Sequence, residues 1–152
     1  RETIIDLFDG RQTYTLHHPN LEQRTLDFAA KQHRWSMGSK SIQTHFLNEK
    51  TPTAYDNFWI QLPYIQYQDQ RILLLDHERL LPSDQKLEVD YLLIHNSPKI
   101  NIADVLKAVS PQCIIFDASN RFSQIKEWKI ECEESNILYY DIQKKGAFIA
   151  TF

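Results

Sequence analysis

Residues 89–119 read VDYLLIHNSPKINIADVLKAVSPQCIIFDAS, and this stretch decides the fold. Two apolar runs, 91–94 and 113–116, flank a segment with helical spacing. Two strands joined by a helical crossover become parallel neighbours in one sheet. Ligands of open α/β sheets gather where the strands end. We therefore look for chemistry first at residues 95–99 and 117–120.

The crossover helix carries clear signals at both ends. We expect Asn101 to cap it, and Asp104 places a negative charge in the first turn, where it suits the helix dipole. Pro111 prevents the helix from continuing. Four apolar residues recur at helical spacing and form one face: Ile102, Val105, Leu106 and Val109.

Further elements follow on both sides of this stretch. An Asp9-Gly10 turn predicts an N-terminal β-hairpin. A helix capped by Asn20 should end near Arg34, and its apolar residues are Leu21, Leu26, Phe28 and Ala29. Residues 37–55 read as a long connection with one short strand or turn, and 80–86 as a loop. The other expected strands are 3–8, 12–16, 57–62, 64–67, 71–75, 137–141 and 147–152.

A second helix should follow Asn120, and Asn136 is placed to leave it in the left-handed conformation. Its expected inward stripe is Phe122, Ile125, Trp128 and Cys132. The fold class is therefore α/β, with a mixed sheet, an N-terminal β-hairpin and a βαβαββ C-terminal half.

Length and composition narrow the function. The chain has 152 residues, the size of one domain. Its net charge is −3, so the chain as a whole does not attract nucleic acid, and nucleic-acid binding would require a local basic patch. Its 3 glycines cannot build a Gly-rich phosphate loop. Cys113 and Cys132 are read as two half-buried apolar residues, and a disulfide between them is the alternative.

The order of elements resembles a known family. The chain has a hairpin, a strand ending in Asp76, a strand ending in His95, then helix, strand, helix, strand and a final strand that opens at Gly146. This order is similar to the metallo-β-lactamase-like domain of ComEC competence proteins. Those are membrane channels that take up DNA in natural transformation. The segments 5–11 and 116–120 resemble the shortened version carried by Bacteroidota-type ComEC proteins.

The resemblance implies a reduced metallo-β-lactamase-like fold. It implies that residues 1–152 are one soluble domain of a larger membrane protein. The start at Arg1, without an initiator Met, also leads us to expect a domain excised from a longer chain. The parent protein would lie in the inner or cell membrane, with this domain on the extracytoplasmic, periplasmic side. The implied partners are single-stranded or double-stranded DNA and the membrane channel domain of the same polypeptide, with no small-molecule substrate.

The metal motif of the family is missing. The fold's His-x-His-x-Asp-His loop packs several ligands into one turn so that two metal ions can hold an attacking hydroxide, and this sequence has no His-x-His. Asp76 and His95 are the residual candidates, and two ligands are fewer than the three that catalytic zinc sites use. We expect a degenerate site with no metal, no cofactor and no enzyme activity.

Several other polar groups have ordinary structural roles as alternatives to a functional one. His17 and His18 are neighbours on a strand and should point to opposite faces. The loop of Asp117, Ser119 and Asn120 could form an active site, but these residues are also common in turns and at helix starts. A hydrolase triad of Ser97, His95 and Asp117 lacks the Gly-x-Ser-x-Gly elbow.

A DNA path is the remaining site hypothesis. Trp35 or Phe122 would stack on bases. The expected phosphate contacts are Arg11, Arg34, Lys40, Lys99 and Arg121. The alternative is that these cations are solvated surface residues.

Three functions follow from these observations. The first is a DNA-uptake domain of a ComEC-like channel that has lost its metal site and has a structural or DNA-guiding role. The second is an active metal-dependent nuclease or hydrolase that uses Asp76 and His95 with ligands from the rest of the parent protein. The third is a plain interaction module, which predicts no DNA binding even at low salt.

Overall fold

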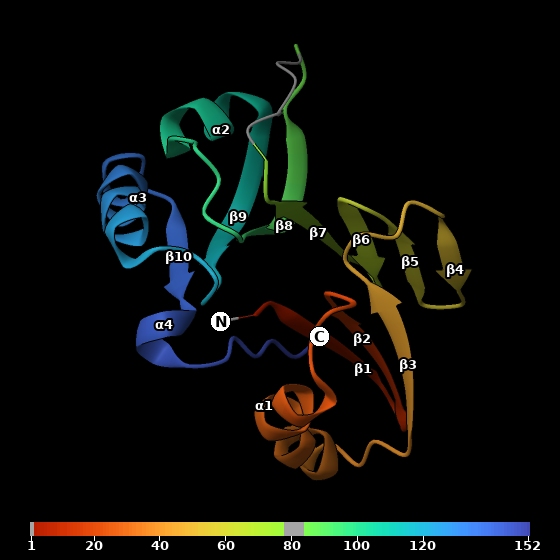
Figure 1. Cartoon of the computed structure of the whole chain (residues 1–152). Helices are drawn as coiled ribbons and strands as arrows, with labels where there is room; N and C mark the ends of the chain where they lie inside the picture. Colours follow the sequence, from red (N-terminus) through yellow and green to blue (C-terminus); the bar gives the residue numbers. More distant parts are fainter. Residues whose placement is uncertain (1, 78–83) are drawn as a thin grey trace. The chain divides into compact units, whose positions relative to one another are not determined.

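The computed structural model describes residues 2–77 and 84–152 (Figure 1). The expected loop at 80–86 lies partly outside them. The chain forms two compact units, Arg1–Thr51 and Pro52–Phe152. Both contain helices and mixed sheets, which confirms the α/β class.

Unit 1 is a small sheet with one helix. Strands β1 (Ile4–Asp9) and β2 (Gln12–His17) form the predicted antiparallel hairpin, and Gly10 takes the turn at φ +59. Strand β3 (Ser41–Phe46) pairs with β2 in parallel. The long connection expected at 37–55 therefore holds a full strand, because helix α1 (Gln23–Ser36) is the crossover that makes parallel pairing possible.

Helix α1 differs from its prediction at its start and in the face that it buries. It begins at Gln23 rather than just after Asn20, and Glu22 precedes it without a side-chain cap. It buries Leu26, Ala30 and Arg34, whereas Phe28, expected among the apolar residues of the helix, is 94% exposed.

In the described part of unit 2, strands form one sheet in the order β10-β9-β8-β7-β6-β5-β4. The pairs from β4 to β7 are antiparallel and those from β7 to β10 are parallel. The strands are β4 (Thr53–Tyr55), β5 (Phe58–Gln61), β6 (Tyr64–Tyr67), β7 (Gln70–Leu75), β8 (Leu87–Ile94), β9 (Val109–Phe116) and β10 (Leu138–Asp141).

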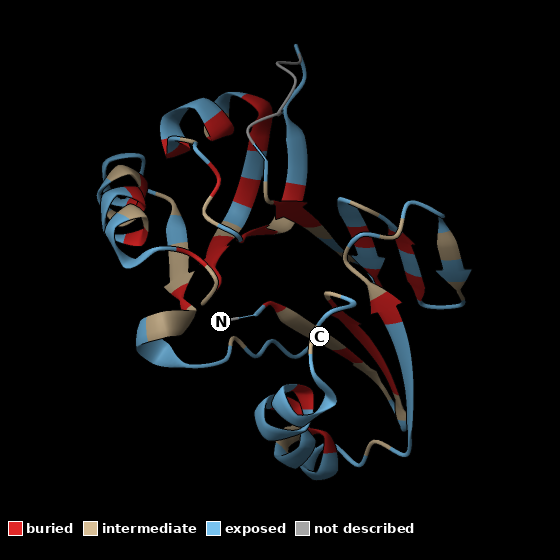
Figure 2. Ribbon diagram, viewed as in Figure 1, coloured by how far each residue is buried: buried red, intermediate tan, exposed pale blue. Residues whose placement is uncertain are grey.

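The parallel half of this sheet carries the core, red in Figure 2. Helices α2 (Ile102–Ala108) and α3 (Phe122–Glu134) pack on it. Phe116 of β9 and Trp128 of α3 are stacked with ring centroids 5.6 Å apart, and both are at most 2% exposed. Burying an aliphatic or aromatic side chain of this size contributes about 2 kcal/mol, so these contacts fix the strand ends that follow.

The Asn101 cap and the Asn136 exit are confirmed, whereas Val109, expected on the apolar face of the crossover helix, is the first residue of β9. The Asn101 side chain accepts the Asp104 backbone N–H at 2.8 Å, and Asn136 leaves α3 at φ 56. Helix α2 ends at Ala108, and β9 begins directly at Val109 with Pro111 inside it. On α3 the predicted stripe is buried except for Phe122, which is 72% exposed at the first turn.

The closing strand at 147–152 was predicted wrongly. After β10 the chain forms a single helical turn, α4 (Ile142–Lys145), and residues 146–152 pair with no strand. Asp141 starts this turn because its carboxylate accepts the Lys144 backbone N–H at 3.3 Å. The Phe148 ring then packs at 5.3 Å on Tyr91 and 5.1 Å on Tyr140. The C-terminal half is therefore βαβαβ followed by a helical turn.

Candidate functional site

Three of the predicted candidates meet at one edge of the unit 2 sheet. Strands β7, β8 and β9 are parallel and end in register, so Asp76, His95 and Asp117, which follow them, lie in one row. The backbone hydrogen bonds that join the parallel strands continue into this row. The His95 N–H donates to Leu75 O at 3.0 Å, and the Asp117 N–H donates to Ile94 O at 3.0 Å.

The side chains of this row have local partners. Asp76 lies 2.8 Å from His77 Nδ1, and both side chains are partly exposed. The Asp117 carboxylate is 5% exposed and accepts the Ser119 backbone N–H at 3.0 Å, as an Asx turn does. His95 is 3% exposed. Two of the three groups are thus enclosed in the fold.

The loops after β8 and β9 are tied together by hydrogen bonds. Asn96 and Ser97 both have positive φ, 61° and 54°, which turns their N–H groups toward the neighbouring loop. The Asn96 N–H donates to Ser119 Oγ at 2.9 Å, and the Arg121 N–H donates to Ser97 Oγ at 2.7 Å. Ser97, proposed as a nucleophile, therefore accepts a backbone bond across the loops.

Asn120 is the centre of this loop network. It is 3% exposed, and its Oδ1 accepts the Ser97 N–H at 2.8 Å. Its Nδ2 donates to Ile94 O at 2.6 Å and to Asp117 O at 2.9 Å. Every side-chain bond of Asn120 thus goes to backbone, which is the pattern of a structural clamp.

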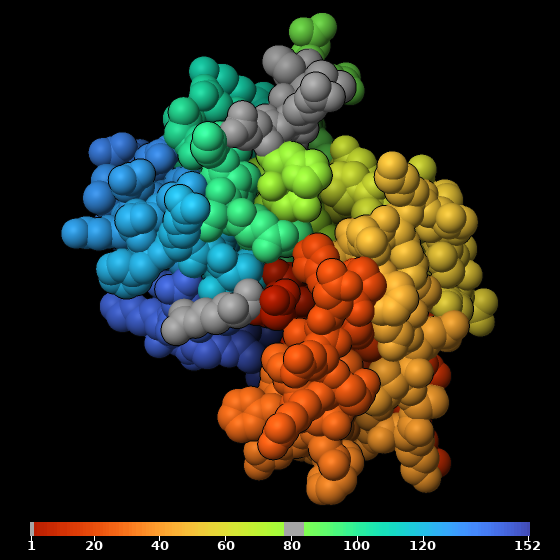
Figure 3. Space-filling view, viewed as in Figure 1, coloured from red at the N-terminus to blue at the C-terminus, as the bar shows by residue number. Residues whose placement is uncertain are grey.

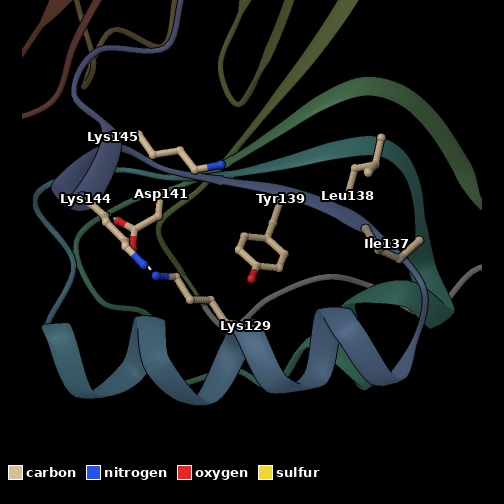
Figure 4. Close-up of a pocket in the computed structure, with 7 residues that line it drawn as sticks. All are labelled: Lys129, Ile137, Leu138, Tyr139, Asp141, Lys144 and Lys145. Atoms are coloured by element: carbon tan, nitrogen blue, oxygen red, sulfur yellow. Dashed lines mark hydrogen bonds and ion pairs between the residues drawn. The ribbon is translucent and has the colours of Figure 1, made fainter.

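The fourth parallel strand adds a carboxylate that the sequence analysis missed. Asp141 ends β10, is 3% exposed and is paired with Lys129 of α3 (Figure 4). Asp141 and Lys129 line a hollow of about 220 Å³ together with Lys144 and Lys145. The signal was present, because Asp141 closes a parallel strand as Asp76 and Asp117 do.

The residues do not fit the metal centre that the resemblance implies. Within residues 2–77 and 84–152 no group of three His, Cys, Asp or Glu side chains is placed to hold a metal ion. Catalytic zinc uses three protein ligands, and the carboxylates of Asp117 and Asp141 already bind a backbone N–H and a lysine. We therefore derive no metal-dependent step.

The predicted phosphate contacts are divided by burial. Arg11, Lys99 and Arg121 are exposed, whereas Arg34 is 5% exposed. Its guanidinium donates to both carboxylate oxygens of Asp6, at 2.7 and 2.8 Å, and to Thr15 Oγ1 at 2.9 Å. This geometry argues against a phosphate contact by Arg34, because its charge is satisfied inside unit 1.

The exposed cations lie in different units. Lys99 and Arg121 follow β8 and β9 at the strand-end edge of unit 2. Arg11 lies at the tip of the unit 1 hairpin, where its carbonyl accepts the Lys40 N–H at 2.8 Å. Arg11 and Lys40 are thus neighbours, and Lys99 and Arg121 lie in two loops that the bond from the Arg121 N–H to Ser97 Oγ joins.

The remaining candidates have structural positions. Cys113 and Cys132 are free thiols rather than a disulfide, and burial raises the pKa of Cys132 to about 12. His17 is 6% exposed and its ring meets Phe46 edge-on at 5.6 Å. Its Nδ1 lies 2.7 Å from His18 O.

The fold and its polar strand ends define an α/β domain that carries basic loops at one edge of the sheet. The chain belongs to the ComEC C-terminal domain family, whose model matches residues 1–152. ComEC proteins are membrane proteins of competence, so this chain has a role in DNA uptake. Neither a curated protein nor a solved structure matches it. Among the described residues, no helix is long and apolar enough to cross a bilayer.

Proposed function

We propose that this chain is a non-catalytic domain that guides DNA toward the uptake channel. The observation that carries the proposal is the division of charge at the strand-end edge. Asp117 and Asp141 are 5% and 3% exposed, while Lys99 and Arg121 are exposed in the loops of the same edge. Asp76 of the same row is partly exposed and pairs with His77, so a DNA phosphate meets cations at the loops after β8 and β9, where the Asp117 carboxylate is enclosed.

The loop network supports a guiding role over a cutting one. Ser97, Ser119 and Asn120 use their side chains to accept or donate bonds to backbone across the loops. Such bonds hold Lys99 and Arg121 on a fixed frame. A nucleophile or a metal ligand would instead need a side-chain oxygen directed at substrate.

The proposal extends to location and partners. We propose that the domain lies on the extracytoplasmic side, where incoming DNA arrives, and works beside the channel domain of the same polypeptide. Its support is the family's role in DNA uptake.

The test combines DNA binding with DNA cleavage. The 152-residue chain is titrated against fluorescein-labelled single-stranded and double-stranded oligonucleotides at low and moderate salt, and anisotropy is measured. We expect binding that weakens with salt, and a shallower salt dependence in Lys99→Gln and Arg121→Gln. The matched control is Lys126→Gln, an exposed lysine on α3 beside Glu127, which should leave binding unchanged.

Two results would overturn the proposal. If the chain binds neither oligonucleotide at low salt, the DNA-guiding function is excluded and the interaction module becomes the favoured function. Stoichiometric manganese or zinc in the purified chain, with DNA cleavage that is lost in His95→Ala, would establish the nuclease instead. Asp76→Asn should then abolish the same cleavage.

A further inference from the structure

Helix α1 presents its aromatic side chains to solvent instead of to the core. Phe28 is 94% exposed and Trp35 is 72% exposed. At about 100° per residue, both lie on the side of the helix opposite the buried Leu26 and Ala30. Single exposed apolar residues are ordinary, but two large rings on the outermost line of one helix are not explained by packing within unit 1.

Cations alternate with these rings. Arg24, Phe28, Lys31 and Trp35 follow one another at spacings of four, three and four residues, which places them on one helix face. All four are exposed, and the surface of α1 is drawn in orange in Figure 3. We call this set the aromatic–basic face of α1. Lys31 Nζ lies 5.3 Å from the Trp35 ring centroid, so a cation and a ring already act together there.

The charge of this face is positive. Asp27 is the acidic residue of α1, and its carboxylate accepts a hydrogen bond from Gln23 Nε2 at 2.7 Å, to one side of the face. Arg34 adds no positive charge to this face, because its guanidinium is paired with the Asp6 carboxylate. Asp27 lies three residues after Arg24 and four before Lys31, so it borders both cations, and the two cations together exceed its single negative charge.

We infer that the aromatic–basic face of α1 binds single-stranded DNA, with Phe28 and Trp35 stacking on bases and Arg24 and Lys31 binding phosphates. This inference rests on the proposed function and names the surface that performs it. Proteins that bind single strands combine a cationic track with exposed rings. The two rings are seven residues apart, about 10.5 Å along the helix axis, which leaves room for stacked bases at both.

The arrangement favours DNA over a lipid surface. A helix that lies in a membrane interface uses a wide, continuous apolar face. In α1 the small apolar side, Leu26 and Ala30, is already buried in unit 1. Lys31 lies between the two exposed rings along the helix, so the rings do not form a continuous apolar surface.

The experiment replaces each aromatic ring of this face by an aliphatic side chain that stays exposed to solvent. Binding of a fluorescein-labelled oligothymidylate to the 152-residue chain is measured by anisotropy at low salt. We expect Trp35→Leu and Phe28→Leu each to weaken binding about tenfold, and Trp35→Phe to retain most of it. Leucine keeps apolar contact and helix propensity but cannot stack, so this pair separates stacking from simple hydrophobic docking.

The matched control is Trp59→Leu. Trp59 is 38% exposed on β5, and its cross-strand neighbours Ala54 and Gln66 carry no charge. This variant should bind as the wild type does. Arg24→Gln and Lys31→Gln should each make the salt dependence shallower by about 0.7 in log–log slope, and melting temperatures should be unchanged because the side chains are exposed.

The outcomes separate this inference from the proposed function. If the wild type binds DNA and the leucine variants bind equally well, the surface is wrong and the guiding function stands. If the wild type does not bind DNA at low salt, both fail. If Phe28→Leu and Trp35→Leu leave DNA binding intact but reduce sedimentation with phosphatidylserine vesicles, the face binds membrane and the inference is overturned.

Discussion

Arg34 binds Asp6 through both oxygens of the carboxylate, at 2.7 and 2.8 Å, with the two side chains only 6% and 12% exposed. The pair links helix α1 to the first strand of unit 1. Thr15 Oγ1 takes a further N–H of the same guanidinium at 2.9 Å. This enclosed pair removes Arg34 from the surface, and it fixes which side of α1 faces outward.

Removing one member of this pair should destabilise unit 1. Arg34→Met leaves the largely enclosed Asp6 carboxylate without its partner, so we expect the free energy of unfolding to fall by about 3 kcal/mol. Urea unfolding followed by circular dichroism measures it. Combining Arg34→Met with Asp6→Leu should recover part of the loss. The control is Asp104→Asn, which breaks the exposed Lys107–Asp104 pair and should have little effect.

Asn120 should contribute more to stability than an ordinary helix cap. Asn120→Ala removes one accepted and two donated hydrogen bonds at a site that is 3% exposed, which should cost about 3 kcal/mol. Asn101→Ala, which removes one capping bond, should cost about 1 kcal/mol. Chemical unfolding of both variants compares them. A smaller loss for Asn120→Ala than for Asn101→Ala would contradict the clamp.

A carboxylate of α3 caps the neighbouring helix. Glu131 Oε2 accepts the N–H groups of Ile102 and Ala103 at the start of α2, at 2.6 and 3.2 Å. Because these bonds carry a charge and lie at the positive end of the helix, we expect Glu131→Ala to lower the free energy of unfolding by about 2 kcal/mol. Glu127→Ala, at an exposed position of the same helix, is the control. Equal losses in the two variants would rule out the cap.

Cys132 should make stability depend on alkaline pH. Burial raises the pKa of this thiol from 9.0 to about 12, with a smaller contribution from the charge of Glu131. The fold therefore favours the protonated thiol, and this stabilisation is present below pH 9 and lost as the pH rises toward 12. Urea unfolding across that range should show a flatter pH dependence for Cys132→Ala than for the wild type. Parallel curves would contradict the prediction.

Local signals predicted the elements they belong to. Asn101 caps α2, Asn136 takes the left-handed exit from α3, and Asp9-Gly10 turns the hairpin. Each effect acts within about one turn of the chain, so the residues in the sequence suffice. Asp76, His95 and Asp117 were likewise predicted at strand ends, and the register of the parallel strands places them in one row.

Long-range packing decided the features that were predicted wrongly. The segment after Gly146 has strand-like residues, but in the structure its Phe148 ring packs on Tyr91 and Tyr140, and both contacts join residues far apart in the sequence or beyond the turn at Gly146. The segment that holds β3 was predicted to be a connection with one short strand or turn, and the exposed polar residues of β3 show no apolar alternation that would have given its length. Its pairing comes from backbone bonds to β2, which carry no side-chain signature.

The sequence by itself determined the α/β order, the start of α2 at Asn101, the exit of α3 at Asn136, the crossover and the family to which the chain belongs. The tertiary structure decided which side chains remain available for DNA. In α1 apolar residues occur on both sides, so periodicity alone could not choose a face. The half-buried carboxylate of Asp6 is paired with Arg34, and this pairing places Phe28 and Trp35 on the side of α1 that faces solvent.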